Sequence, residues 1–334
     1  MARIAPLRDP YGRALDYLRL SVTDRCNLRC AYCLPESAAD FSPAAESLSD
    51  DEVVFLAGCF ARLGFSRVRL TGGEPLVRTG LPELVARLSR LPGVKDLSLS
   101  TNGILLADLA APLAAVGLGR VNISLDTLEP GRFKGLARFG NLPEVLRGIE
   151  AALDAGLSPV KLNTVVIRGS NEDEVAALAA LTDRRPLHVR FIELMPMGET
   201  GFYSPERLVP MVEIMRRAGP LEVLPSDDRP RGGGPARYYR RPGARGTIGV
   251  ISALSCGFCA DCNRVRLSTV GKLIPCLDGM EGEDLAGPLR AGASPEEIQG
   301  RILAVVARKP ERHFMLERSA PEAVGPRSMC SIGG

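Results

Sequence analysis

The chain has 334 residues and a formal net charge of +3, and 45% of its residues are hydrophobic. This length suits one barrel with an extension, and the hydrophobic content is enough for a sizeable core. The near-neutral charge and the low aromatic content argue against a dedicated nucleic-acid-binding protein. There is no bilayer-length apolar run and no apolar secretory signal at the N-terminus. We therefore expect a cytoplasmic protein with neither a membrane nor a nucleic acid as its partner.

Strand-like and helix-like segments alternate from residue 16 to about residue 195. The expected strands are LRLSVT, RVRLTGG, DLSLSTNG, RVNISLDT, VKLNTVVI and HVRFIELM. Segments with helical periodicity lie between them, for example SDDEVVFLAGCFARLG, which follows a good N-cap and has acidic residues in its first turn. Six β–α repeats of this kind predict a parallel sheet, either doubly wound or curled into a barrel.

Polar and glycine-rich residues recur at the ends of these strands, at 71–74, 100–103 and 124–126. A loop with three cysteines follows the first strand in the same way. Because the active sites of β/α barrels form at the carboxyl ends of their strands, we expect these groups to converge on one mouth.

The composition changes after residue 200. The segment PSDDRPRGGGPARYYRRPGARG indicates loops and hairpins, and RVRLSTVGKLIPCL predicts a hairpin that turns at Val270–Gly271. A helix, SPEEIQGRILAVVARKP, and an irregular tail ending SIGG follow. The expected divisions are an N-terminal segment (1–15), a barrel (16–200), a C-terminal extension (201–320) and a tail ending in Gly-Gly (321–334).

The nine cysteines are mostly clustered, which in a cytosolic chain indicates metal ligation rather than disulfides. Cys26, Cys30 and Cys33 share one short loop. A closed zinc site normally needs four ligands, whereas three thiolates on a [4Fe–4S] cluster leave one iron open for a ligand. Zinc completed from elsewhere in the chain remains the alternative. Cys59 lies among apolar residues at helical spacing and is expected in the core.

The second group contains Cys259, Cys262 and Cys276, with Cys256 three residues upstream. Four thiols could form a zinc ribbon. Alternatively, three could hold a second cluster with an open iron while Cys256 is a bystander. Arg264 and Arg266 beside them occupy alternate positions, so both would face one side of a strand. Such a pair suits a triphosphate, although solvated charges on a surface hairpin are the simpler alternative.

The spacing of Cys26, Cys30 and Cys33, with Tyr32 before the last thiol, matches the CxxxCxxC signature of radical SAM enzymes. TGGEP at 71–75 matches the glycine-rich segment of that superfamily. From about Asp16 to Gly334 the chain resembles the GTP 3′,8-cyclases of molybdenum cofactor biosynthesis, the MoaA family. The segments that carry this resemblance are LRLSVTDRCNLRCAYC, RLTGGEPLVR, STNG, NISLDT, RFIELM, the C-terminal CxxC…C and the final GG. It implies an α/β fold: an incomplete (β/α)6 TIM-type radical SAM barrel whose C-terminal extension carries a second Fe–S cluster.

The resemblance also implies the site residues. Two [4Fe–4S] clusters would be held by Cys26, Cys30 and Cys33 and by Cys259, Cys262 and Cys276, the open iron of the second binding guanine. S-adenosylmethionine (SAM) would contact Tyr32, Gly73, Ser124 and Met195. GTP would contact Arg19, Arg69, Ser100, Lys161, Arg264, Val265 and Arg266. Catalytic roles would fall to Arg190, Gly333 and Gly334.

The reaction implied is that of a lyase. A 5′-deoxyadenosyl radical from SAM would abstract hydrogen from C3′ of GTP, and the C3′ radical would attack guanine C8 to give (8S)-3′,8-cyclo-7,8-dihydroguanosine 5′-triphosphate. The implied partners are GTP, an external electron donor, a downstream cyclic pyranopterin monophosphate synthase and a second copy in a homodimer. Two alternatives compete with this hypothesis: a radical SAM enzyme acting on another substrate, and a zinc-ribbon nucleic-acid-binding protein.

Overall fold

A computed structural model describes residues 7–36, 46–197, 200–278 and 282–317. All six expected strands are present. They pair in chain order and all run parallel, which confirms the predicted α/β fold. These strands are β3 (Tyr17–Ser21), β4 (Arg67–Thr71), β5 (Asp96–Thr101), β6 (Arg120–Ser124), β7 (Val160–Val166) and β8 (Leu187–Glu193).

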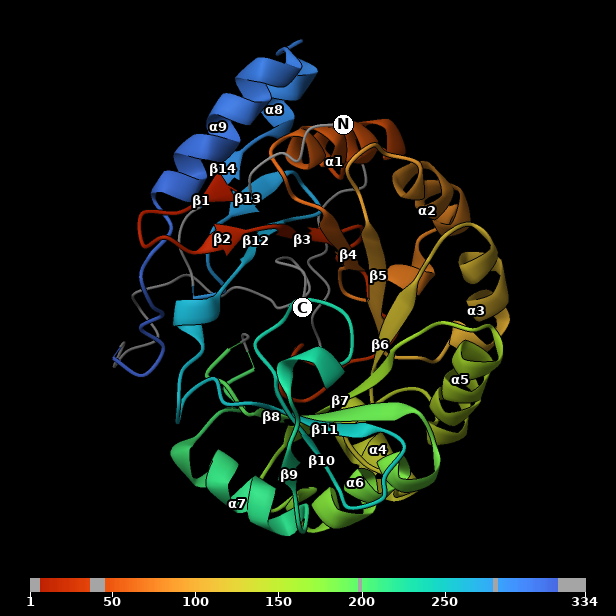
Figure 1. Ribbon diagram of the computed structural model, residues 1–334. Coiled ribbons are helices and arrows are strands. Elements are labelled where there is room, and N and C mark those ends of the chain that lie inside the picture. Colours follow the sequence, from red (N-terminus) through yellow and green to blue (C-terminus); the bar gives the residue numbers. More distant parts are fainter. Residues whose placement is uncertain (1–6, 37–45, 198–199, 279–281, 318–334) are drawn as a thin grey trace.

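Helices surround the curved sheet on its outer side (Figure 1). The helices between these strands are α1 (Asp50–Arg62), α2 (Leu81–Ser89), α3 (Leu106–Ala115), α4 (Pro130–Ala137), α5 (Leu142–Asp154) and α6 (Val175–Arg184). The later ones are α7 (Met211–Arg217), α8 (Ala286–Arg290) and α9 (Pro295–Ala307). Of the helices in the described ranges, none is both long and apolar enough to cross a membrane.

The C-terminal part adds strands to both edges of the same sheet. β11 (Thr247–Ile251) pairs parallel with β8, and β12 (Arg264–Leu267) pairs parallel with β3. Antiparallel strands continue beyond them: β10 (Arg237–Arg240), β9 (Glu222–Val223), β13 (Lys272–Ile274) and β14 (Glu283–Asp284). A small separate hairpin joins β1 (Leu7–Arg8) to β2 (Ala14–Leu15). The expected extension is therefore built into the barrel sheet, which periodicity alone did not predict.

Local signals account for several element boundaries. Ser49 and Glu52 form a capping box at the start of α1, as its acidic N-terminus predicts. The β12–β13 hairpin turns at Gly271, whose φ of 78° favours glycine. Cys59 is 2% exposed in the core, as expected.

Alternation along the strands gives the sheet two different faces. On β3, Leu18 and Leu20 are fully buried in the apolar core under the helices. Tyr17 and Arg19, at the alternate positions, line the interior instead. In an ordinary TIM barrel the interior is packed with branched aliphatic side chains. Here it contains charged side chains, and this difference creates the site.

Candidate active site

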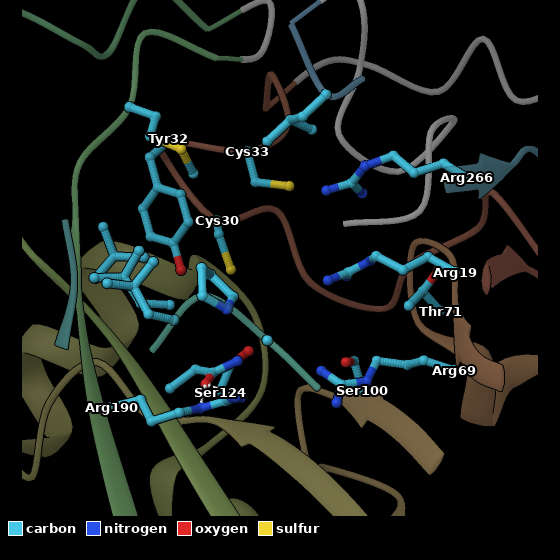
Figure 2. A pocket seen from close by; sticks show the side chains of 18 of the residues that line it. Arg19, Cys30, Tyr32, Cys33, Arg69, Thr71, Ser100, Ser124, Arg190 and Arg266 are labelled. Atoms are coloured by element: carbon cyan, nitrogen blue, oxygen red, sulfur yellow. Dashed lines mark hydrogen bonds between the residues drawn. The ribbon is translucent and has the colours of Figure 1, made fainter. Parts of the chain in front are cut away.

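One cavity of about 350 Å³ lies inside the curved sheet and is lined by both cysteine groups. Most of the residues expected from the sequence line it. They are Cys26, Cys30, Cys33, Cys259, Cys262 and Cys276, with Tyr32, Gly73, Ser124 and Met195, and with Arg19, Arg69, Ser100, Arg190, Arg264 and Arg266. Figure 2 shows Arg19, Arg69 and Arg266 pointing into the same space as Cys30 and Cys33. The strand-end residues at 71–74, 100–102, 124 and 126 line the same cavity as the first cysteine loop, as the sequence predicted for these segments.

The strand directions place the two cysteine groups at opposite ends of this cavity. Cys26 follows the carboxyl end of β3. Cys262 precedes the amino end of β12, which runs parallel to β3 with Arg264 opposite Tyr17. Cys276 follows β13, which is antiparallel to β12, and so returns to the same end as Cys262. A ligand lying between the groups would therefore span the length of the strands.

The first cysteine loop packs directly on the TGGEP turn. A Cβ on Gly73 would lie 2.4 Å from the carbonyl oxygen of Arg25 and 2.5 Å from that of Asp24. The Gly73 amide donates to the carbonyl of Thr23 at 2.8 Å. Any side chain at this glycine would therefore push away the segment that leads into Cys26, whether or not a cofactor is bound.

The end of α4 supports the other side of this loop. The amides of Ala31 and Arg29 donate to the carbonyls of Leu136 (2.8 Å) and Ala137 (3.1 Å). The Leu28 amide donates to the Cys26 sulfur at 3.4 Å. Hydrogen bonds to sulfur are a usual feature of thiolates that ligate Fe–S clusters, so the loop is already shaped for such a role.

Two buried carboxyl groups lie at this end. Burial raises the pKa of Glu74 to about 7, although it accepts hydrogen bonds from the Thr101 hydroxyl (2.7 Å) and the Asn102 amide (2.6 Å). Burial likewise raises the pKa of Asp126 to about 6, and its carboxylate accepts a 2.6 Å hydrogen bond from the Tyr32 hydroxyl. Both carboxyl groups would be stabilised in the charged form by a cationic ligand.

The second cysteine group is held by a basic side chain and by a main-chain amide. Arg13 donates to the carbonyl of Cys259 at 2.8 Å, and the His313 amide donates to the Cys259 sulfur at 3.4 Å. Burial acts to raise the pKa of the Cys262 thiol, but Arg264 and Lys309 outweigh it and lower this pKa to about 7. A thiol that ionises this readily suits metal ligation.

Cys256 does not join this group. It is exposed and is absent from the cavity lining, although it lies three residues before Cys259. This placement agrees with the interpretation of Cys256 as a bystander.

Glu193 connects the second cysteine group to the barrel, and sequence reasoning missed it. Its carboxylate, fully buried at the end of β8, accepts from the amides of Met211 (3.0 Å), Leu254 (2.9 Å) and Ser255 (3.0 Å). The Ser255 hydroxyl also donates to it. A charged residue inside the apolar RFIELM strand was the available signal, since a buried carboxylate needs several donors.

Three of the arginines that line the cavity have no salt-bridge partner among the described residues. Within the described ranges, none of the ion pairs involves Arg69, Arg190 or Arg264. Burial lowers the pKa of Arg69 to about 9 and that of Arg266 to about 10. Desolvated cations at this density are costly unless an anion binds among them, so the wall is suited to a polyphosphate.

Two expected substrate contacts lie outside the cavity lining. The Lys161 amine is buried and donates to the Arg231 carbonyl at 2.6 Å, and burial lowers its pKa to about 5. The chain beyond Arg231 supplies Gly233 and Gly234 to the lining instead, a contribution that sequence reasoning missed.

Val265 is fully buried in the core, because it alternates with Arg264 and Arg266, so a substrate contact there would fall to its main chain. Gly333 and Gly334 lie outside the described residues.

The cysteines among the described residues are not arranged around a single metal ion. Among the residues that the structure describes, no three His, Cys, Asp or Glu side chains come together closely enough to hold one metal ion. A structural zinc ion needs ligand atoms about 2.0–2.3 Å away.

Comparisons with known proteins agree with this geometry. Residues 20–182 match the family model described as "Radical SAM superfamily", and residues 187–315 match "Molybdenum Cofactor Synthesis C". A GTP 3′,8-cyclase of Pelotomaculum thermopropionicum is 51% identical over 98% of this chain and 100% of its own length. A GTP 3′,8-cyclase of Heliobacterium modesticaldum is 49% identical, over 98% of this chain and 99% of its own.

Solved structures support the same fold. SuiB of Streptococcus suis bound to S-adenosylmethionine aligns with a TM-score of 0.56 at 14% identity, covering 95% of this chain and 77% of SuiB. Its complex with the precursor peptide SuiA gives a TM-score of 0.57 at 12% identity, over 96% and 77%. At such identities the likeness concerns the fold alone. The two family models and the two cyclase relatives show that the chain belongs to the GTP 3′,8-cyclase family of molybdenum cofactor biosynthesis, within the radical SAM superfamily.

Proposed function

We propose that the cavity is the active site in which the chain converts GTP to its 3′,8-cyclised product. The family carries two [4Fe–4S] clusters and uses SAM. One observation supports the proposal above the others: two three-cysteine groups lie at opposite ends of one cavity, with desolvated arginines between them. Such a cavity can accept a polyanionic nucleotide between two metal centres.

The first cysteine loop would hold the cluster that binds SAM, through Cys26, Cys30 and Cys33. When bound, that cluster and SAM supply a 5′-deoxyadenosyl radical. The chain supplies placement and excludes water. Gly73 keeps the loop close to the sheet, Ser124 offers a hydroxyl and Met195 a thioether to the nucleoside part of SAM, and Tyr32 is fixed by Asp126.

The other end would hold GTP. Cys259, Cys262 and Cys276 would carry the cluster that faces guanine. Binding of the triphosphate and ribose would involve Arg19, Arg69, Ser100, Lys161, Arg264, Arg266 and the main chain of Val265. Arg190, from the opposite wall, would act close to the reacting ribose, and Gly333 and Gly334 would contribute from the tail. Since Lys161 donates to the loop at Arg231, we expect it to act through the position of this loop.

Several finer assignments belong to this proposal. We propose an external electron donor, a cytoplasmic location, a homodimer, and a downstream cyclic pyranopterin monophosphate synthase that takes the product. We also keep the expected divisions at about residues 15, 200 and 320. The division at 200 would separate SAM chemistry from substrate binding, although both parts contribute to one sheet.

Iron and sulfide analysis tests the proposal. The wild-type protein, reconstituted without oxygen, should contain about eight irons per chain, and a Cys259→Ala/Cys262→Ala variant about four. The variant should still cleave SAM under reducing conditions but give no cyclised product from GTP. About four irons in both proteins, with zinc in the wild type, would contradict the proposed substrate site while leaving the radical SAM assignment intact.

A further inference from the structure

Two asparagines hold the guanidinium groups of Arg69 and Arg190. Asn122, on β6, is 1% exposed. With its amide oxygen turned toward the guanidiniums, it accepts from Arg190 Nη2 at 2.9 Å and from Arg69 Nη2 at 3.2 Å. Asn163, on β7, accepts through Oδ1 from Arg190 Nε at 2.8 Å. Two arginines from β4 and β8 are thus tied together across the strands between them.

The same strand holds another buried arginine in a different way. Arg120 lies two residues before Asn122 on the same face of β6. Its Nε and Nη2 donate to the Asp96 carboxylate at 2.7 and 2.6 Å. Arg120 is absent from the cavity lining, whereas Arg69 and Arg190 line it. A carboxylate therefore holds Arg120, which does not face the cavity, and amides hold Arg69 and Arg190, which do.

The difference between amide and carboxylate matters because the pair is desolvated. Arg69 and Arg190 are each 5% exposed. An aspartate at either asparagine position would have nearly the same shape and could accept the same hydrogen bonds. It would also neutralise one of the two positive charges. A neutral acceptor fixes the direction of each guanidinium and leaves its charge for a ligand.

We propose that Asn122 and Asn163 are positioning residues that set specificity for a nucleoside triphosphate, by orienting Arg69 and Arg190 through neutral oxygens. This inference rests on the proposed function, since it takes the polyphosphate of GTP as the anion that these arginines bind. It adds that selectivity for the triphosphate depends on the acceptors of these hydrogen bonds being amides rather than carboxylates.

Asparagine-to-aspartate variants test this directly. Asn122→Asp and Asn163→Asp are compared with Asn141→Asp, which adds the same charge at the exposed N-cap of α5, where aspartate is equally acceptable. The protein is reconstituted with its clusters and kept free of oxygen. Its binding of GTP, GDP, GMP and guanosine is then measured by calorimetry. We expect the Kd for GTP to rise about tenfold or more in the two barrel variants. The rise should be smaller for GDP and GMP and absent for guanosine.

The salt dependence gives a second readout. GTP binding to Asn122→Asp should depend less on ionic strength than binding to the wild type, because one charge of the pair is already compensated. Iron content and SAM cleavage should match the wild type in all three variants, and Asn141→Asp should bind every ligand normally.

Three outcomes would overturn the inference. Unchanged GTP binding in both barrel variants would show that the neutral charge is irrelevant. An equal loss for guanosine and GTP, without a change in salt dependence, would show that the asparagines only support the wall. A wild-type protein that contains eight irons but binds no GTP would overturn the proposed function itself. This outcome is distinguished from the other two because it is seen in the wild type, whereas they are seen only in the variants.

Discussion

The two ends of the cavity bury opposite charges. At the first cysteine loop, burial raises the pKa of Glu74 and Asp126, so each carboxylate is disfavoured in its charged form. On the arginine wall, burial lowers the pKa of Arg69 and Arg266. Each end therefore favours a ligand of the opposite charge. The ammonium and sulfonium groups of SAM match the carboxyl end, and the triphosphate of GTP matches the arginines.

The two ends are also held by different means. The first cysteine loop has main-chain contacts on both sides, with Gly73 on one side and the carbonyls at the end of α4 on the other. The second group is fixed by side chains that come from distant segments, such as Arg13 and Glu193. Single substitutions should therefore disturb the second end more selectively than the first.

The largest expected effects separate the two ends. Cys30→Ala should abolish both SAM cleavage and product formation, because the first cluster loses a ligand. Cys262→Ala should keep SAM cleavage and lower GTP cyclisation by roughly a thousandfold or more, the scale of losing an essential group. Formation of 5′-deoxyadenosine and of the cyclised nucleotide, measured by chromatography, checks both. Equal loss of SAM cleavage in the two variants would contradict the assignment of separate roles.

A smaller effect is expected at Glu193. Glu193→Gln replaces one acceptor oxygen with an NH2 group. Because this group is itself a donor and faces backbone amides, the loop with Leu254 and Ser255 should shift. Supporting groups around metal sites are commonly worth about 10–100-fold in activity. We expect a loss of this size in GTP cyclisation, with an altered electron paramagnetic resonance signal of the second cluster only.

The control for Glu193 is Glu129→Gln, which changes an exposed carboxylate at the start of α4. It should leave both cluster signals unchanged. A Glu193→Gln enzyme whose first-cluster signal changes as much as its second would show that Glu193 supports the whole fold rather than one end.

The first end could be predicted from the sequence more fully than the second. Cys26, Cys30, Cys33 and Gly73 act within two adjacent β–α units, so spacing and periodicity are enough to bring them together. The second end depends on the pairing of β11 with β8 and of β12 with β3, far apart in the chain. No local sequence pattern predicts such pairing. The contacts of Glu193, the lining of the cavity by Gly233 and Gly234, and the hydrogen bond from Lys161 to Arg231 all depend on it.

The smallest effect concerns stability at the carboxyl end. The pKa of Glu74 is about 7 in the folded protein, against a usual value of 4.5. Between these pH values the folded state binds more protons than the unfolded state, so the free energy of unfolding falls as pH rises from about 4.5 to about 7. Glu74→Gln cannot ionise. The stability of this variant relative to the wild type should therefore increase over that interval by on the order of 3 kcal/mol or less.

Thermal unfolding of the cluster-loaded proteins at pH 5 and pH 8 measures this change. Glu83→Gln, at an exposed position in the first turn of α2, is the matched control and should show no pH-dependent difference from the wild type. Saturating SAM should reduce the effect, because a cationic ligand stabilises the ionised carboxylate that burial disfavours. If the Glu74→Gln difference is the same at both pH values, this carboxyl group is already charged without SAM, and the contrast between the two ends rests on Asp126 and the arginines.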